Sequence, residues 1–419
     1  MKETGYLFKE KLNLFFGYFF QYILSIAFSV IIIPKLANNL GFSTFGQIGS
    51  LLSICGILIV FINYSFNITS VPKIATEKVK DNLIELINHV LISRLFLSIF
   101  CIIFLFLIGF FGFIDFSFQT YLLLIIFLVS NALNSSFCLI GLSKFNLIII
   151  GNIICSILSI FFYFLLHNFD HFNSLYSVLF IILLPQLLFN FYTLIIIFFI
   201  IEINFKFTCK KVLKLLISDF SIFLSQFTSS IYIMAGPLIL IALSNNEEAG
   251  IYSIIDRINN LVSAGLTMIF SLFIPTLALM FENQFLKYKL LIKKILVIYF
   301  FLLLAVLLVF FLGKNTFLLH LFSSVSIKFS IIIYLSIVYI SLASLGPIIT
   351  NHLVLSGKKK YILILTLVIL IVTIFTSIFL TKIFGATGWL ISQIFGQLII
   401  LIYFSLIFTN KKHDKKNYF

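Results

Sequence analysis

The feature that most constrains this chain is a series of apolar runs, each about 20 residues long, that recur along almost its whole length. At a rise of about 1.5 Å per residue, such a run spans the hydrocarbon core of a bilayer as an α-helix. Hydrophobic residues make up 62% of the chain and charged residues 10%, a balance that no water-soluble core can absorb. The sequence therefore predicts an all-α, polytopic membrane protein with about 12 transmembrane helices.

The predicted spans divide into two sets of six. The first set covers residues 12–34, 47–66, 91–113, 121–141, 147–166 and 177–201, and the second covers 215–243, 250–281, 295–312, 329–355, 361–380 and 388–408. An even number of spans leaves both halves in the same orientation. We therefore expect two six-helix bundles, residues 1–205 and 206–419.

Similar motifs occur in the same order in both halves, which indicates an internal repeat. The corresponding pairs are Gln21 and Gln226, Gly46 and Gly250, Pro72-Lys73-Ile74-Ala75 and Pro275-Thr276-Leu277-Ala278, and Gly141-x-x-Lys144 and Gly357-x-x-Lys360. The first three pairs are 203 to 205 residues apart, whereas the last needs an insertion in the second half.

The loop charges predict the orientation, because Lys and Arg accumulate in cytoplasmic loops. With the N-terminus inside, cytoplasmic segments hold 22 lysines and the opposite loops hold 4. Both termini are therefore expected in the cytoplasm. The net charge of +14 follows from this topology and does not indicate nucleic-acid binding.

The five cysteines include no C-x-x-C pair, so we expect neither a metal site nor a disulfide framework, and no cofactor.

Polar residues at helical spacing mark one face of several predicted spans. In span 250–281 they are Asp256, Asn260, Ser263, Thr267 and Ser271. Because Asp256 and Asn260 are not packing residues, we expect them to line a cavity. Gln21, Gln226 and Asn63 are further candidates on other spans. In the second span, by contrast, the small residues such as Gly46 and Gly49 favour close helix packing.

Two arginines lie inside predicted spans. Arg257 lies seven residues into its span, where a bare arginine costs about 2.5 kcal/mol or more unless it has a partner or a wet cavity. The sequence leaves two interpretations open, a cavity-lining role and a local pairing with Asp256 or the interface. Arg94 lies nearer the inner end of its span, where we expect it to anchor at the interface.

Several short motifs are similar to those of a known family. Pro34-Lys35-Leu36-Ala37, Leu40-Gly41, Phe45-Gly46, Tyr64-Ser65-Phe66-Asn67 and Ile74-Ala75 resemble the opening of bacterial polysaccharide exporters of the O-antigen flippase type. These exporters belong to the multidrug/oligosaccharidyl-lipid/polysaccharide (MOP) superfamily. In the second half, Gly250-Ile251-Tyr252-Ser253, followed by Arg257 and Pro275, is similar to the second-bundle motif of the family.

The resemblance implies two six-helix bundles around a central basic cavity, as in MATE transporters. It implies that the protein is no enzyme but flips undecaprenyl-pyrophosphate-linked oligosaccharide, such as the O-antigen unit of lipopolysaccharide, across the bacterial inner membrane by alternating access. Arg257 matches the family's eighth-helix arginine, which would meet the pyrophosphate. The implied partners are the lipid-linked oligosaccharide and membrane lipids, with polysaccharide polymerase machinery as a further candidate.

The first helix departs from one branch of the family. It has Gln21, Ser25 and Ser29 where the related lipid II flippases carry a charged pair, which argues against lipid II as the substrate. The coupling ion, a proton or a sodium ion, is therefore left unassigned.

Two other functions compete with this interpretation. A drug or cation exporter on the same fold would bind organic cations through intramembrane carboxylates, whereas the deep charge here includes Arg257. An O-antigen polymerase or ligase typically has a large outer catalytic loop. The longest predicted outer loop, residues 313–328, is short and has no clustered acid, base or nucleophile.

Overall fold

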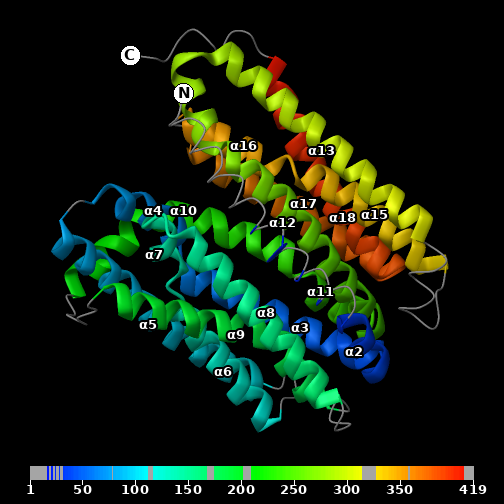
Figure 1. Ribbon diagram of the computed structural model, residues 1–419. Helices are drawn as coiled ribbons and strands as arrows, with labels where there is room; N and C mark the ends of the chain where they lie inside the picture. Colours follow the sequence, from blue (N-terminus) through cyan, green and yellow to red (C-terminus); the bar gives the residue numbers. More distant parts are fainter. Residues whose placement is uncertain are drawn as a thin grey trace. The chain divides into compact units, whose positions relative to one another are not determined.

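The structure, a computed structural model, describes residues 17, 20, 21, 24, 28, 32–77, 79–111, 117–167, 174–201, 209–313, 327–356 and 359–409. All regular secondary structure within these residues is helical, as Figure 1 shows. The predicted all-α fold is thus confirmed for the described part of the chain.

The described residues form two compact units. Unit 1 takes in those of Met1–Leu40 and Leu51–Ser230, and unit 2 those of Gly41–Ser50 and Ile231–Phe419. The helices that begin before residue 231 are α2 (Ile33–Leu40), α3 (Phe42–Asn63), α4 (Phe66–Thr76), α5 (Lys80–Phe110), α6 (Phe118–Ala132), α7 (Ser136–Gly141), α8 (Phe145–His167), α9 (Leu175–Ile200) and α10 (Cys209–Met234). The helices that follow are α11 (Gly236–Leu243), α12 (Asn246–Asn283), α13 (Phe285–Gly313), α15 (Ile327–Ala343), α16 (Gly346–Leu355), α17 (Lys359–Phe384) and α18 (Ala386–Thr409).

Both units contain part of α3 and part of α10, because the chain changes unit inside these two helices. The last change of unit along the chain falls between Ser230 and Ile231. The division into bundles 1–205 and 206–419 stays a prediction.

Eight helical segments of the described residues are long and apolar enough to cross a membrane. A ninth is present if α10 and α11, which are bent by 48° at their junction, count as one span. Each predicted span from 47–66 to 388–408 coincides with one helix or with two consecutive helices. The first predicted span, 12–34, lies largely outside the described residues, so the total of twelve stays a prediction.

Several spans are broken into two helices. α11 begins at Gly236-Pro237 and α16 begins at Gly346-Pro347. Proline is tolerated in the first turn of a helix, where its missing N–H is not needed, and it stops the preceding helix. The fourth predicted span of each half is broken, because residues 133–135 separate α6 from α7 and two residues separate α15 from α16. The repeat is therefore visible in the helix geometry as well as in the motifs.

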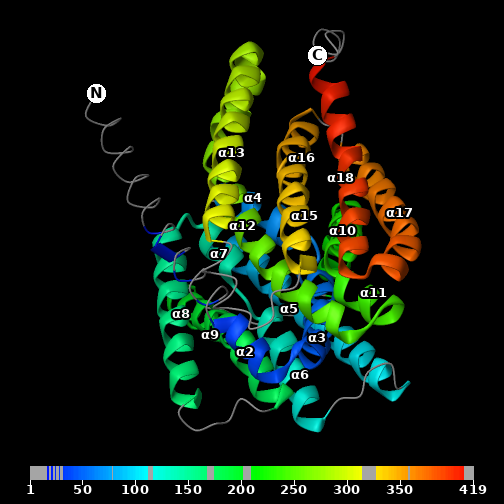
Figure 2. The ribbon, with the colours of Figure 1, turned by 90° about the vertical axis from the view of Figure 1, so that its right-hand side faces the viewer.

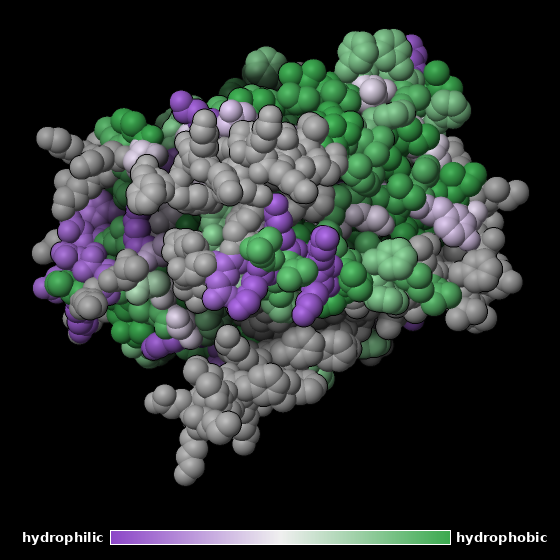
Figure 3. All heavy atoms as spheres, turned by 90° about the horizontal axis from the view of Figure 1, so that it is seen from above, coloured by the Kyte–Doolittle hydropathy of each residue, from purple (hydrophilic) through white to green (hydrophobic). Residues whose placement is uncertain are grey.

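Apolar side chains cover the outside as well as the inside of each unit. On α17, Ile371, Phe375 and Phe379 are about three-fifths exposed and recur every four residues on one face. Figure 2 shows α17 beside α18, and Figure 3 shows hydrophobic residues over broad areas of one face of the molecule. An exterior as apolar as the core is typical of a helix bundle in lipid. The chain is thus a multi-pass membrane protein.

Close packing explains the glycines at the start of α3. A methyl group at Gly46 would overlap the carbonyl oxygen of Asn246 at the start of α12, and one at Gly49 would overlap the Ser253 side chain. All four residues belong to unit 2. The predicted packing role of Gly46 and Gly49 is therefore confirmed.

Candidate functional site

The helix α12 brings together two of the predicted cavity residues, Asp256 and Asn260. The helix begins after Asn245, whose side chain accepts a hydrogen bond from the Glu248 backbone N–H at 2.8 Å. Two turns further on, Asn260 Nδ2 donates to Asp256 Oδ2 at 3.0 Å. The Tyr252 hydroxyl lies 3.3 Å from Asp256 Oδ1. Both carboxylate oxygens of Asp256 therefore have a partner on the same helix.

The helix α18 adds a polar residue that the sequence reasoning missed. Gln393 Oε1 lies 3.4 Å from the Tyr252 hydroxyl, and Gln393 Nε2 donates to the Tyr232 carbonyl at 3.5 Å. The fully buried Trp389 ring stands edge-on to the Tyr252 ring, with 6.4 Å between the ring centroids. A possible signal was present, since Gln393 and Gln397 are amides four residues apart in an otherwise apolar span.

Arg257 lies beside this group and is half-buried. It interacts electrostatically with Asp256, its neighbour in the chain. Among the described residues, however, neither a hydrogen bond nor an ion pair joins the Arg257 side chain to another residue, and Asp256 is engaged by Tyr252 and Asn260. Both interpretations of Arg257, a cavity-lining role and a local pairing with Asp256, therefore stay predictions.

The polar stripe of α12 stays accessible along the helix. Asn260 and Thr267 are exposed, and Ser263 between them is half-buried. The Thr267 hydroxyl donates to the Ser263 carbonyl at 2.8 Å, and Asn260, whose Nδ2 donates to Asp256, still exposes its amide on the surface of the helix. Within a bilayer, such an accessible polar face is stable only against water or another polar surface.

The other three candidates belong to unit 1. Gln21, Asn63 and Gln226 are all half-buried, with Asn63 at the end of α3 and Gln226 within α10. The six candidates are therefore divided equally, since Asp256, Arg257 and Asn260 belong to unit 2. That all six line one cavity stays a prediction.

The expected interfacial role of Arg94 is wrong. Arg94 is only 1% exposed and lies among α4, α5 and α7 of unit 1. Its Nη1 donates to the Asn134 carbonyl at 2.7 Å, its Nη2 donates to Asn67 Oδ1 at 2.6 Å, and its guanidinium lies 4.4 Å from the centroid of the Phe137 ring. Arg94 therefore binds the backbone at the break between α6 and α7, a contact for which no local motif was present.

A chain of side-chain amides extends from this break into unit 1. Asn134 Nδ2 donates to Asn190 Oδ1 at 2.5 Å, and Asn190 Nδ2 donates to Ser130 Oγ at 3.1 Å. One turn away, Gln186 Nε2 donates to Asn131 Oδ1 at 2.8 Å. Satisfied polar networks of this kind rigidify a buried region, so we assign these residues to the architecture and not to substrate binding.

Metal chemistry has no visible basis in the residues that the structure describes. No group of three or more His, Cys, Asp or Glu side chains there is placed to hold a metal ion. Cys55, Cys101, Cys138 and Cys155 are buried free thiols.

Solved structures with the same architecture are transporters. The fold is similar to that of the lipid II flippase MurJ in an inward closed conformation, with a TM-score of 0.69 and 13% identity over 95% of this chain and 88% of that chain. It is similar to an inward-facing multidrug resistance MATE transporter of the MOP superfamily (TM-score 0.60, 14% identity, 93% and 99% coverage). It is also similar to a MOP superfamily transporter from Pyrococcus furiosus (TM-score 0.53, 15% identity, 92% and 92% coverage). The chain therefore has the fold of the MOP superfamily.

The family itself is shown by the sequence. Among curated proteins, a search finds no match. The profile of a family described as polysaccharide biosynthesis protein matches residues 11–281, which is more than half of the chain. The chain thus belongs to the polysaccharide biosynthesis protein family, within the MOP superfamily of transporters.

Proposed function

We propose that this protein is a flippase for a polyprenyl-pyrophosphate-linked oligosaccharide, the repeat unit of O-antigen or of another surface polysaccharide. It moves this lipid from the cytoplasmic to the outer leaflet of the bacterial inner membrane by alternating access, and it is not an enzyme. Membership of a polysaccharide biosynthesis family supports the role, and the similar fold of a lipid II flippase supports a lipid-linked substrate.

The proposal rests on the hydrogen bonding around Arg257. Its half-buried guanidinium makes no hydrogen bond or ion pair with another described residue, whereas the adjacent Asp256 is engaged by Tyr252 and Asn260. A guanidinium presents two parallel N–H donors that match the oxygens of a phosphate group. Arg257 is thus available to bind the pyrophosphate of the substrate.

The remaining candidates suit the oligosaccharide. Asn260 is an exposed amide on the same helix, and Gln21, Asn63 and Gln226 are half-buried amides. Each primary amide both donates and accepts hydrogen bonds, as the hydroxyl groups of a sugar do. In the proposed cycle no cofactor is needed, and a proton or a sodium ion drives the return to the inward-facing state.

Complementation of a deletion strain tests the proposal. We expect Arg257→Ala to abolish most surface polymer at normal membrane levels of the protein, and Arg257→Lys to restore part of it, because an ammonium keeps the charge but not the planar donor geometry. The matched control is Lys382→Ala, which removes an exposed cation from the same unit and should leave the polymer unchanged.

The same strain separates substrate binding from a local ion pair. If Arg257 only balanced Asp256, then Asp256→Asn would be as harmful as Arg257→Ala and the double substitution would restore export. We expect no such restoration. Wild-type polymer from Arg257→Ala would refute the proposal, and a loss of resistance to organic cations with intact polymer would favour a drug exporter.

A further inference from the structure

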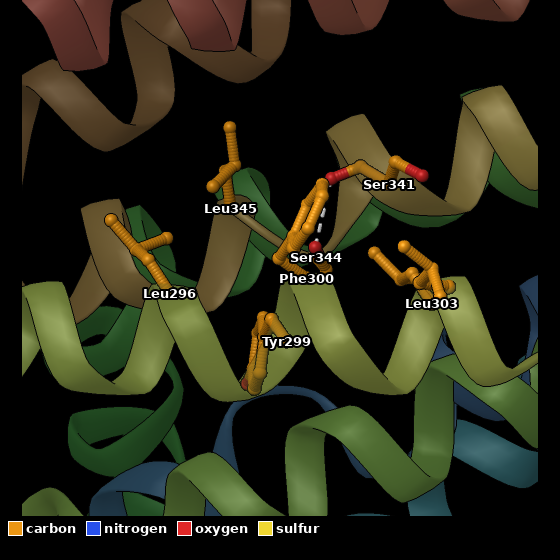
Figure 4. Close-up of a pocket in the computed structure, with 8 residues that line it drawn as sticks. Leu296, Tyr299, Phe300, Leu303, Ser341, Ser344 and Leu345 are labelled. Carbon is orange, nitrogen blue, oxygen red and sulfur yellow. Dashed lines mark hydrogen bonds between the residues drawn. The ribbon is translucent and has the colours of Figure 1, made fainter.

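Unit 2 contains an apolar pocket of about 350 Å³ at the break between α15 and α16. Figure 4 shows that Leu296, Phe300 and Leu303 of α13 form one wall and that Ser341, Ser344 and Leu345 form the other. The α13 residues that line the pocket are apolar and also reach the surface, with Phe300 63% exposed and Leu304 40% exposed. The pocket therefore opens on a hydrophobic face, where lipid is expected.

The internal repeat shows that this pocket is a place where the two halves differ. Arg94 and Tyr299 each lie 14 residues after the first residue of their helices, α5 and α13. In unit 1 the Arg94 guanidinium binds the break between α6 and α7 through the Asn134 carbonyl. At the corresponding break in unit 2 there is no such cation among the lining residues, and the space is an apolar pocket.

The hydroxyl groups around the pocket are already used as donors. Ser341 Oγ donates to the Ile337 carbonyl at 2.7 Å, and Ser344 Oγ donates to the Ser341 carbonyl at 2.8 Å. The Tyr299 hydroxyl points to α12 and donates to the Leu266 carbonyl at 2.7 Å. The walls thus offer no spare hydroxyl donor to a ligand, and the occupant that fits best is a hydrocarbon without ester carbonyl groups.

A positive charge lies on the same face of α13 as the pocket wall. Lys293 is exposed and precedes Leu296 by three residues and Phe300 by seven, which places all three on one side of the helix. Along the helix axis, Lys293 and Leu296 are about 4.5 Å apart at 1.5 Å per residue. A phosphate bound by Lys293 would therefore lie close to the mouth of the pocket.

We propose that, before the pyrophosphate of the substrate reaches Arg257, this pocket holds the first isoprene units of its polyprenyl chain while Lys293 binds the phosphate. The inference rests on the proposed function, because that function supplies the polyprenyl carrier. In a polyprenyl phosphate the phosphate is joined directly to the hydrocarbon, whereas in a phospholipid the glycerol and its esters intervene. The short spacing from Lys293 to Leu296 favours a polyprenyl chain over a phospholipid. So do the serine hydroxyls of the pocket, because they already donate to backbone carbonyls.

The surrounding bilayer limits how much binding free energy the pocket can provide to the polyprenyl chain. Lipid tails are as apolar as leucine, so the hydrophobic effect alone does not draw a chain from the bilayer into the pocket. Selectivity comes instead from van der Waals contact with Leu296, Phe300 and Leu303 and from the attraction between Lys293 and a phosphate. Removing either contribution should weaken binding of the chain.

Site-specific photo-crosslinking of the full chain in vesicles tests the inference. The variants are Phe300→p-benzoylphenylalanine and, as a matched control, Phe301→p-benzoylphenylalanine, because both phenylalanines are 63% exposed but only Phe300 lines the pocket. The probe is radiolabelled undecaprenyl phosphate in phosphatidylglycerol-containing vesicles. We expect saturable capture at position 300, several-fold above position 301, and competition by unlabelled undecaprenyl phosphate.

Two further pairs of variants locate the binding contacts. Ser341→Trp fills the pocket and should reduce capture at position 300 several-fold, whereas Val338→Trp, at a 48% exposed position of the same helix outside the pocket, should not. Lys293→Gln should weaken capture, whereas Lys294→Gln, on a different face of α13, should not.

Equal, non-saturable capture at positions 300 and 301 would overturn the inference, as would capture at position 300 that unlabelled undecaprenyl phosphate does not reduce. Its failure is distinct from failure of the proposed function. If Arg257→Ala stops export while capture at position 300 is not saturable, only the pocket inference fails. If capture is saturable but the protein moves no lipid-linked oligosaccharide, the pocket inference holds and the proposed function fails.

Discussion

Gly46 of α3 and Gly250 of α12 lie against each other in a reciprocal contact. A methyl group at Gly46 would overlap the carbonyl of Asn246, four residues before Gly250, and one at Gly250 would overlap the carbonyl of Phe42, four residues before Gly46. The two glycines correspond to each other in the internal repeat. The start of α3 and the start of α12 therefore cross through the same motif, in a locally two-fold arrangement.

We predict that Gly46→Ala and Gly250→Ala each lower the free energy of unfolding by about 1 to 3 kcal/mol, because the added methyl group forces two helix backbones apart. Denaturation of the purified protein in mild detergent measures the change. The control is Gly346→Ala, where the added methyl group meets no atom within 4 Å. Equal stability of Gly46→Ala and Gly346→Ala would show that the crossing is not close-packed.

Substitutions of Arg94 test whether its hydrogen bonds stabilise the break between α6 and α7. Arg94→Ala leaves the Asn134 carbonyl without its charged donor, so we predict a loss of about 2 to 4 kcal/mol in the free energy of unfolding. Arg94→Lys should recover only part of this, because a lysine cannot reach both Asn134 and Asn67 with a planar pair of donors. Lys80→Ala, an exposed change at the start of the same helix, serves as the control. Wild-type stability of Arg94→Lys would instead agree with an interfacial anchor.

Glu248 stabilises the start of α18. Its Oε2 accepts a hydrogen bond from the Ala386 backbone N–H at 2.9 Å, and its negative charge lies at the positive end of that helix. Glu248→Ala should therefore lower the free energy of unfolding by about 0.5 to 2 kcal/mol. Glu247→Ala, at the exposed neighbouring position, should have little effect, and thermal unfolding of the two variants side by side gives the comparison. If both variants melt together, the contact between Glu248 and Ala386 adds no stability.

The spans and the glycine packing were predictable because both depend on local patterns. Apolar runs of sufficient length mark every span within the described residues, and Gly46 and Gly49 have the small side chains that a close helix crossing needs. The breaks after Ala235 and Leu345 also have a local signal in Gly-Pro.

Tertiary contacts explain what the sequence could not show. The break at Asn134 has neither glycine nor proline, and its partner Arg94 lies 40 residues earlier in the chain. Gln393 meets Tyr252 across 141 residues, so the periodicity of either helix alone could not reveal the pair. Periodicity places a residue on a helix face, but it does not say which other helix that face meets.

The orientation is testable independently of the substrate. Because 22 loop lysines fall on one predicted side and 4 on the other, reporter fusions after Lys144 and Lys359 should read cytoplasmic, and fusions after Asp170 and Glu248 should read external. Alkaline phosphatase and green fluorescent protein fusions give complementary signals. The reversed pattern would refute the predicted topology.

Transbilayer movement of the substrate by the purified protein tests the central claim most directly. Sealed vesicles would contain the protein and a polyprenyl-pyrophosphate-linked oligosaccharide, and an impermeant glycosidase would report the fraction in the outer leaflet under imposed proton or sodium gradients. The account predicts protein-dependent movement, with Arg257→Ala weakening substrate binding by about 1.5 to 3 kcal/mol, which is roughly tenfold to a hundredfold. Movement by Arg257→Ala as fast as by the unaltered protein, or no movement by the unaltered protein under either gradient, would contradict it.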